Sequence, residues 1–386
     1  MFEQLKSFQF RTRIFSGIGA ISGLGELAKS IGGKKYLLVA DPSLQSHGIL
    51  ESARKSLKDA NIGGEVSLKV EPEPYLDNAD AAAEIGRDIQ ADVVIGLGGG
   101  SAMDTAKAAA VLLTNYGKAE QYIGLNVVKI KGVPTIMIPT TAGTGSEVTF
   151  TAVFTNRHTK AKGGINSVLM FPDAALLDPE LTLSLPPEVT ASTGMDALTH
   201  AIESVTSLSS TVFTESLSFT AVRLITESLR TAVYRGSDIK AREKMLLGSL
   251  FGGLALADAG VGAAHALAYP LGGNYRIPHG LANAILIPHV MEFNLPAAER
   301  AMALIAKNMG ERVDSLSMRW AAEAAVDAVR TLCDDIGRPA GLSDINVPMD
   351  DIPMLVEGAL KVTRPVENNP RKLGPEEATA IYEAAY

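Results

Sequence analysis

The first half of the chain alternates short apolar runs with segments that repeat apolar residues at helical spacing. Three apolar runs, at residues 36–40, 92–97 and 135–138, and one segment that alternates apolar and polar residues, at 66–70, are predicted to be β-strands. Helical patterns lie between them, at residues 44–60, 80–90 and 102–113. Strands that alternate with helices of about 10–15 residues are typical of βαβ units in a parallel sheet. We therefore expect an α/β domain with a Rossmann-like parallel sheet over residues 1–185.

The second half of the chain has a different pattern. It is rich in alanine and follows helical periodicity over seven segments: 188–206, 211–234, 238–268, 280–294, 296–308, 317–336 and 375–385. No convincing strand pattern occurs there. Pro186 and Pro187 mark the boundary, because proline ends regular elements and stiffens linkers. The prediction is an all-α domain over residues 186–386, with no internal repeat.

Composition and charge exclude several classes of protein. The 386 residues are 46% hydrophobic and 20% charged, which is typical of a folded globular chain. A net charge of −8, without a dense run of lysine or arginine, argues against a nucleic-acid partner. A single cysteine, Cys333, excludes an internal disulfide framework and a cysteine-rich zinc site.

The apolar runs are too short for a membrane protein. No run reaches the ~18 apolar residues of a membrane-spanning helix. The first residues, MFEQLKSFQFRTRIF, lack the apolar stretch and the small-residue cleavage site of a signal peptide. We therefore expect a cytoplasmic protein with no membrane partner.

A glycine-rich run, residues 96–101, follows the third predicted strand and precedes a helix. Glycine lets a backbone approach a pyrophosphate, and a helix that begins near Ser101 offers free N–H groups and a positive dipole end. The run fits G-x-G-x-x-G only with Ser101 in the third glycine position, so a tight structural turn is the alternative. An acid that binds the ribose is expected about 20 residues downstream, which favours Glu120. Asp41, at the end of an earlier strand, is the alternative candidate for the acid that binds the ribose.

A second loop, residues 139–147, follows the fourth predicted strand. It combines small residues with five hydroxyl or carboxylate side chains. Ligands of open α/β sheets bind beyond the carboxyl ends of the strands. Two small-residue loops at two strand ends therefore favour a nucleotide site over two structural turns.

The histidines suggest a metal site. Asp196 and His200 are four residues apart, so they share one face of a helix. His265 lies in a small-residue segment, and His279 lies at the start of a predicted helix. One carboxylate and three imidazoles suit a divalent transition metal such as Fe²⁺ or Zn²⁺. The alternative is a chance D-x-x-x-H spacing with histidines that serve only as buried polar groups.

The other conspicuous side chains are assigned no chemistry from their pattern. Structural or surface roles are expected for His47, His158 and His289. On pattern alone, core packing is expected for Tyr269 and Trp320.

In this order along the chain, the motifs resemble those of the iron-containing (group III) alcohol dehydrogenases, which share the dehydroquinate synthase-like fold. The matching segments are residues 98–104, 139–147, 194–200, 265–283 and 369–371. The resemblance covers nearly the whole chain. Several motifs in the right order are far more specific than any one of them.

The resemblance implies a ligand set and a cofactor site. Fe²⁺, with Zn²⁺ as the alternative, would be held by Asp196, His200, His265 and His279. NAD would be bound by Asp41, Gly98, Gly99, Gly100, Ser101, Asp104, Thr140, Thr141, Thr144 and Lys162. In this assignment Asp41 replaces Glu120 as the acid that binds the ribose. The metal ligands are catalytic because the metal polarises the substrate oxygen.

One position departs from the family pattern. The family often has a histidine four residues after the third ligand, and that histidine is thought to help move a proton near the nicotinamide. This chain has Tyr269 there. Tyr269 is therefore a candidate for the proton relay, and packing before Pro270 is the alternative.

The expected activity is reversible hydride transfer between NAD(H) and a small alcohol/aldehyde pair. Within the same family, a short hydroxyacid (4-hydroxybutyrate-like) dehydrogenase is the alternative. A metal-dependent, dehydroquinate synthase-like lyase or cyclase and a non-enzymatic nucleotide-binding protein are alternatives from other classes. We also expect a homo-oligomer, dimer or larger.

Overall fold

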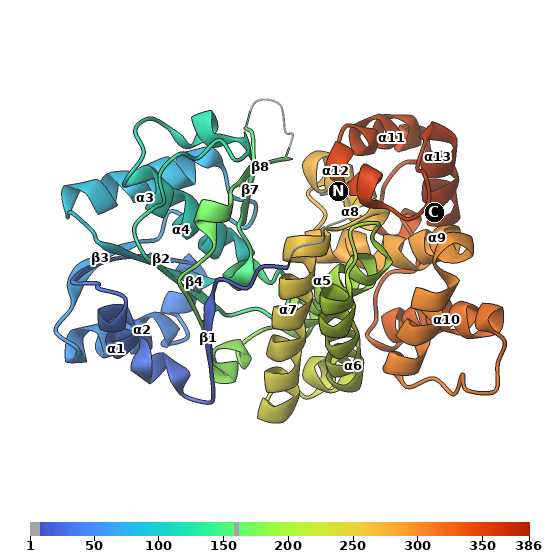
Figure 1. Ribbon diagram of the computed structural model, residues 1–386, viewed down its shortest axis with the longest axis horizontal. Helices are drawn as coiled ribbons and strands as arrows, with labels where there is room; N and C mark the ends of the chain where they lie inside the picture. Colours follow the sequence, from blue (N-terminus) through green and yellow to red (C-terminus); the bar gives the residue numbers. More distant parts are fainter. Residues whose placement is uncertain (1–7, 158–161) are drawn as a thin grey trace, which may run out of the picture. The chain divides into compact units, whose positions relative to one another are not determined.

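The computed structural model describes residues 8–157 and 162–386, which form two compact units (Figure 1). The α/β unit is Phe10–Ser184, and the helical unit is Leu185–Tyr386 with the first described residues. Phe8 stacks on Phe213 with ring centroids 5.4 Å apart, and the N–H of Gln9 donates to Asp258 over 3.1 Å. These two residues, placed by the sequence division in the first domain, therefore pack on the helical unit. His158 lies outside the described residues.

The α/β unit is built on a six-stranded sheet in which every pairing is parallel. Its order is β1-β9-β6-β4-β2-β3. The strands are β1 (Arg13–Ser16), β2 (Lys35–Ala40), β3 (Gly63–Ser67), β4 (Val93–Gly98), β6 (Thr135–Pro139) and β9 (Ala174–Leu177). A smaller sheet, ordered β5-β8-β7, consists of β5 (Gly124–Leu125), β7 (Thr151–Thr155) and β8 (Lys162–Asn166). The expected Rossmann-like parallel sheet is confirmed.

Helices cover both faces of the large sheet. Alternate residues of one strand face opposite sides. Leu38 of β2 thus packs with α1 (Leu24–Ser30) and α2 (Ile49–Asp59), and Leu37 packs with α3 (Leu76–Asp88) and α4 (Gly100–Leu112). Burial on both faces explains why the central strands are continuous apolar runs rather than alternating ones.

The order of the strands identifies a ligand-binding edge. β3 flanks β2 on one side and β4 flanks it on the other, so the direction in which strands are added reverses between β2 and β4. Ligands of doubly wound sheets bind at such a switch point, beyond the carboxyl ends of the strands. The loops after β2 and β4 therefore flank the expected binding crevice.

The helical unit contains no strand among its described residues. Its helices are α5 (Pro187–Thr206), α6 (Val212–Tyr234), α7 (Ile239–Ala259), α8 (Ala263–Tyr275), α9 (His279–Met309), α10 (Met318–Asp335), α11 (Ile352–Leu360), α12 (Thr363–Asn368) and α13 (Pro375–Ala384). Within residues 8–157 and 162–386, no single helix is long and apolar enough to cross a membrane. Helices α7 and α8 reach the length and apolar composition of a membrane-spanning segment only when they are taken together across the bend between them.

Two sequence predictions for this unit were wrong. The helix expected at residues 238–268 is two helices, α7 and α8, bent by 104° at a break that begins at Gly260, whose φ is +70°. The two helices expected at 280–294 and 296–308 are present as the two parts of α9, which is broken by a kink at Ala298. Trp320 is not core: it lies in the first turn of α10 and is 65% exposed.

Candidate metal centre and cofactor loops

Helix α5 supplies the first candidate ligands. Its second half is buried on all sides, because α6, α7 and α9 pack around it. Asp196 and His200 are one turn apart and both are buried. Burial of a charge without a partner is costly in free energy. The buried Asp196 and His200 are therefore expected to contact charged groups, hydrogen-bonding groups or a metal.

The other two histidines begin helices that approach α5. His265 lies in the first turn of α8, and His279 is the first residue of α9. A Cβ added to Gly280 would lie 2.2 Å from the carbonyl oxygen of Ser192 on α5. Glycine at this position therefore lets the start of α9, and His279 with it, come close to Asp196.

Three of the four predicted ligands meet. The Oδ1 atom of Asp196 lies 3.8 Å from Nε2 of His265 and 3.8 Å from Nε2 of His279. One potential ligand atom from each residue lies within 4.8 Å of the others. These separations are too long for hydrogen bonds. They are close to the about 3.4 Å that separates two ligand atoms of one tetrahedral ion with bonds of ~2.1 Å. The donor set therefore fits a divalent transition metal.

His200 lies beside this group of three rather than within it. Its ring stacks on that of His265, with centroids 4.7 Å apart and an angle of 19° between the planes. His200 also helps to set the charge of the site. Burial acts to raise the pKa of Asp196, but His200, His279, His265 and a hydrogen bond from Asn283 hold that pKa below its usual value. The carboxylate is thus ionised, as a metal ligand must be.

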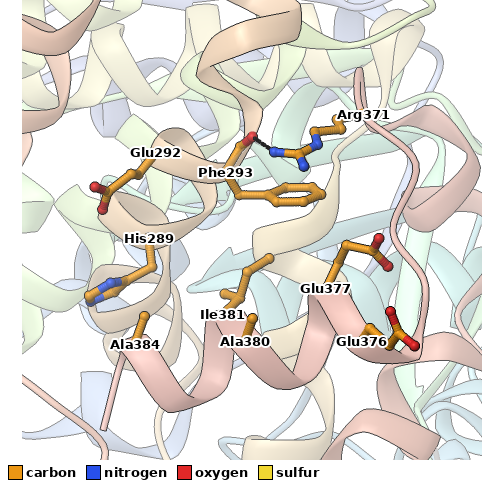
Figure 2. A pocket seen from close by; sticks show the side chains of 9 residues that line it. All are labelled: His289, Glu292, Phe293, Arg371, Glu376, Glu377, Ala380, Ile381 and Ala384. Atoms are coloured by element: carbon orange, nitrogen blue, oxygen red, sulfur yellow. Dashed lines mark hydrogen bonds between the residues drawn. The ribbon is translucent and has the colours of Figure 1, made fainter.

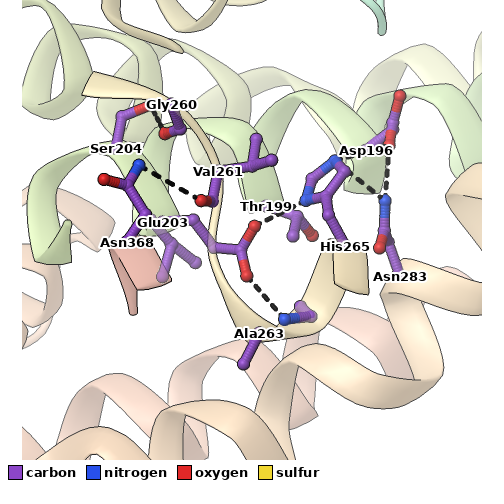
Figure 3. A network of polar contacts seen from close by, with 12 residues as sticks. Asp196, Thr199, Glu203, Ser204, Gly260, Val261, Ala263, His265, Asn283 and Asn368 are labelled. Atoms are coloured by element: carbon purple, nitrogen blue, oxygen red, sulfur yellow. Dashed lines mark hydrogen bonds and ion pairs between the residues drawn. The ribbon is translucent and has the colours of Figure 1, made fainter. Parts of the chain in front are cut away.

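Two buried side chains that the sequence did not single out contact the ligands (Figure 3). The Oε2 atom of Glu203 lies 2.5 Å from Nδ1 of His265. The amide nitrogen of Asn283 donates to Oδ1 of Asp196 over 2.8 Å and lies 3.2 Å from Nε2 of His265. A signal for Glu203 was present: it is seven residues after Asp196, so it shares the same helical face.

The segment that carries His265 is held by two asparagines near the C-terminal end of the chain. Asn368 donates to the carbonyl of Ala259 over 2.6 Å, and Asn369 accepts from the N–H of Ala263 over 3.3 Å. These contacts fix the break between α7 and α8, from which the first turn of α8 presents His265.

Tyr269 lies next to the candidate metal centre. Its ring stacks on that of His279, with centroids 5.5 Å apart and planes 8° apart, and the side chain is partly exposed. Helix α8 continues past Pro270 to Tyr275, so Tyr269 lies within the helix rather than at its end. Its role in proton transfer stays a prediction.

In the α/β unit, three predicted cofactor segments meet at one sheet edge. A Cβ added to Gly98 would lie 3.2 Å from Cβ of Asp41, and one added to Gly100 would lie 2.8 Å from Cγ2 of Thr144. The N–H of Thr140 donates to the carbonyl of Gly98 over 2.9 Å. Gly98 has a φ of +147°, which favours glycine. The loops that follow β2, β4 and β6 are therefore in contact at the switch point.

The remaining predicted cofactor residues lie in or beside these loops. Gly99 lies next to Thr141, because a Cβ on Gly99 would be 3.4 Å from the Thr141 hydroxyl. The Ser101 hydroxyl donates to the carbonyl of Pro72 over 2.6 Å, and Lys162 pairs with Glu73 over 2.8 Å.

Asp104 connects the helix that follows the glycine-rich run (residues 96–101) to the loop at residues 139–147. Its carboxylate accepts from the Ser146 hydroxyl over 2.6 Å and from the N–H of Val153 over 2.8 Å. Contact of Asp104 and the other predicted cofactor residues with a nucleotide stays a prediction. Glu120 is exposed in a 3₁₀ turn, Ala119–Tyr122.

The two other described histidines lie elsewhere. His47 is exposed, with Nδ1 3.1 Å from the carbonyl of Ser43. His289 lines a pocket of about 370 Å³ between α9 and α13, together with Phe293 and Arg371 (Figure 2). The guanidinium of Arg371 lies 4.2 Å from the centre of the Phe293 ring. Burial and the nearby Arg330 lower the pKa of His289, against the opposing effect of Glu292.

Two family models match the chain. Residues 11–179 match the family described as iron-containing alcohol dehydrogenase, and residues 190–386 match the C-terminal part of the Fe-containing alcohol dehydrogenase family. The chain belongs to the iron-containing alcohol dehydrogenase family. The resemblance inferred from the sequence motifs is therefore confirmed, together with its fold of an α/β unit followed by a helical unit.

Individual members of the family are similar over nearly their whole length. The 1,3-propanediol dehydrogenase of Citrobacter freundii is 41% identical over 374 residues, 96% of each chain. The NAD-dependent methanol dehydrogenase of Bacillus methanolicus is 37% identical, over 92% of this chain and 93% of its own. A crystal structure of 1,3-propanediol oxidoreductase has a TM-score of 0.97 at 39% identity and covers 99% of this chain and 100% of its own.

Proposed function

We propose that this family member transfers hydride reversibly between NAD(H) and a small alcohol/aldehyde pair, at a divalent metal held by Asp196, His200, His265 and His279. One observation carries the proposal: a buried carboxylate oxygen lies 3.8 Å from two imidazole nitrogens on two other helices. The names of the relatives support the substrate class, since they are dehydrogenases of 1,3-propanediol and methanol.

When bound, a divalent transition metal supplies Lewis acidity toward the alcohol oxygen, and NAD supplies the hydride acceptor. The residues of the chain hold and orient these groups. Asp196 contributes a negative charge among three imidazoles. In this proposal Tyr269 passes a proton between the substrate oxygen and solvent through its hydroxyl, which its stacking on His279 and its partial exposure support. A phenol with a reference pKa of about 10 relays a proton here rather than acting as a free base.

We infer that the cofactor is NAD, bound at the switch point of the sheet. The first N–H groups of α4 have no acceptor within their own helix, so they can bind a pyrophosphate. Glycine at positions 98 and 100 lets these loops pack closely at the start of α4, because side chains there would meet Ala102 and Thr144. Asp41 adjoins this loop, where a carboxylate accepts from a ribose 2′-OH and repels a 2′-phosphate.

We further propose a homo-oligomeric, cytoplasmic enzyme that binds neither nucleic acid nor membranes. The sheet ends at β1, a short edge strand on which Phe15 is 41% exposed, and Phe10 beside it is 54% exposed. Exposed edges and apolar patches favour association of copies. Light scattering after size-exclusion chromatography tests the oligomer, with a monomer mass as the contradicting result. A cytoplasmic location fits a reaction that uses NAD(H).

The activity is tested by NADH absorbance with a panel of small alcohols, diols, aldehydes and short hydroxyacids, with and without added Fe²⁺. We expect NAD reduction by small alcohols or diols that depends on the metal. Activity with hydroxyacids alone would replace the substrate class by the hydroxyacid alternative. No NAD-linked turnover with any substrate of the panel would contradict the proposal.

A further inference from the structure

We propose that Glu203 is a positioning residue for the metal, which fixes the proton of His265 on Nδ1 so that Nε2 faces the other ligands. The inference rests on the proposed function, because it assigns Glu203 a task at the same metal centre. It concerns a residue that contacts a ligand, not the substrate.

Glu203 is built into the site. It is 3% exposed and lies on α5, seven residues after Asp196, so both carboxylates project from one face of one helix. Its Oε2 atom is 2.5 Å from Nδ1 of His265. A charged hydrogen bond of this length holds a ring orientation well.

The two oxygens of Glu203 are both committed as acceptors. Oε2 contacts Nδ1 of His265, and Oε1 accepts from the backbone N–H of Ala264 over 2.6 Å. An ionised carboxylate offers only acceptors. We therefore assign the proton to Nδ1 of His265, which then donates to Oε2.

The opposite side of the His265 ring agrees with this assignment. The amide nitrogen of Asn283, which has only donors, lies 3.2 Å from Nε2 of His265. An amide nitrogen cannot accept, so Nε2 of His265 accepts in this contact, which Asn283 shares with Nε2 of His279 at 3.4 Å. In this tautomer the lone pair of Nε2 points toward Asp196 and His279, as a metal ligand requires.

Glu203 also holds the backbone that presents His265. Gly262 precedes α8, and a Cβ there would lie 3.2 Å from Oε1 of Glu203. The carboxylate therefore packs directly against the break between α7 and α8. Both effects, on the ring and on the backbone, depend on two acceptor oxygens rather than on the charge alone.

A near-isosteric variant tests whether both acceptor oxygens of Glu203 are needed. Glu203→Gln keeps the size of the side chain but has one acceptor oxygen and one donor amide. If the oxygen stays on the Ala264 N–H, the amide faces Nδ1 of His265, which must then accept. The proton moves to Nε2, and Nε2 can no longer bind a metal. If the amide turns the other way, the Ala264 N–H faces a donor.

The experiment is a Co²⁺ titration of metal-stripped protein, followed by visible absorption, which reports both affinity and coordination. We expect Glu203→Gln to bind Co²⁺ about 10–100-fold more weakly than the unchanged chain, with an altered spectrum. Glu188→Gln, an exposed carboxylate on the same helix, is the matched control and should bind like the unchanged chain. Far-UV circular dichroism checks that each variant is folded.

The outcomes distinguish the inference from the proposed function. Equal affinity and an equal spectrum in Glu203→Gln, with Co²⁺ bound by the unchanged chain, would overturn the role of Glu203 and leave the metal site intact. No Co²⁺ binding by the unchanged chain would overturn both. If Glu203→Gln fails to fold, NMR of ¹⁵N-histidine in the metal-stripped unchanged chain decides, because no metal then fixes the position of the proton. Protonated Nδ1 on His265 is expected, and protonated Nε2 would overturn the inference.

Discussion

Tyr269 stacks on His279 with their ring planes only 8° apart and their centroids 5.5 Å apart. The phenol that replaces the second histidine of the family pattern is thus beside a candidate metal ligand. We expect Tyr269→Phe to lower turnover by more than about tenfold, equivalent to ~1.4 kcal/mol of barrier, because the relay hydroxyl is lost while metal content stays constant. Steady-state rates together with metal analysis check this.

Tyr269→His should move the pH optimum for turnover downward, because an imidazole titrates near ~6.5 and a phenol near ~10. Tyr275→Phe is the control on the same helix, since the hydroxyl of Tyr275 bonds to Asp351 instead. A Tyr269→Phe enzyme with an unaltered rate and pH profile would show that protons leave by another route.

The metal ligands make a second prediction. His265→Ala and His279→Ala should each lose both metal and turnover while their circular dichroism stays unchanged, because each removes one imidazole from the buried group. Chelation should remove activity, and Fe²⁺ should restore it better than Mg²⁺, since imidazole suits transition metals. His47→Ala, at an exposed site, is the control. Full activity of a metal-free preparation would refute the metal-dependent mechanism.

The choice of cofactor depends on Asp41. Replacing Asp41 with Gly should raise the use of NADP relative to NAD, because the carboxylate that repels a 2′-phosphate is gone. Rates with NAD and NADP at equal concentrations measure the change. Asp59→Gly, at the end of α2, serves as the control. If the unchanged chain prefers NADPH to NADH, Asp41 does not select against the 2′-phosphate.

Glu147 predicts an effect of pH on stability. It is 1% exposed, and neither carboxylate oxygen has a hydrogen-bond partner among the described residues. Burial raises the pKa of Glu147 from 4.5 to about 7, against the opposing effects of its own backbone and Lys107. The folded chain thus keeps a proton that the unfolded chain releases. The contribution of Glu147 to stability is complete below about pH 4.5 and is lost as the pH rises through about 7.

Glu147→Gln removes this titration. Relative to the unchanged chain, the variant should gain up to about 3 kcal/mol of stability between about pH 5 and about pH 8. Urea unfolding at the two pH values measures the gain. Glu120→Gln, exposed in the same unit, should show no such trend. A stability difference that is the same at both pH values would contradict the shifted pKa.

The sequence predicted the buried strands β2, β4 and β6 and the edge strand β3, but it missed the buried four-residue strand β9 as well as β1 and β8. β2, β4 and β6 are continuous apolar runs because both of their faces are covered. β1 is four residues long at an exposed edge, and β8 contains two glycines. Neither has the alternation or the apolar run of a strand, and both depend on pairing with distant partners.

The break between α7 and α8 was hidden for a related reason. Alanine and leucine continue on both sides of residues 260–262, so helical periodicity does not end there. The break is held by Asn368, Asn369 and Glu203, which lie far from it in the sequence. Local pattern cannot show contacts of this kind.

The candidate site was predictable only in part from its residues. Asp196 and His200 share a helical face, which their spacing indicates. His265 and His279 lie on other helices, and the sequence joined them to the first pair only through the residue types that suit a transition metal and through the family resemblance. Glu203 and Asn283 escaped notice because their roles depend on where the first turns of α8 and α9 meet α5.

The most direct test of the account is a crystal structure of the iron-loaded protein with anomalous scattering measured at the iron edge. One strong peak is expected within about 2.0–2.3 Å of ligand atoms of Asp196, His265 and His279, with His200 as the fourth ligand. An iron peak elsewhere, or no peak in crystals of active enzyme, would contradict the proposed metal centre.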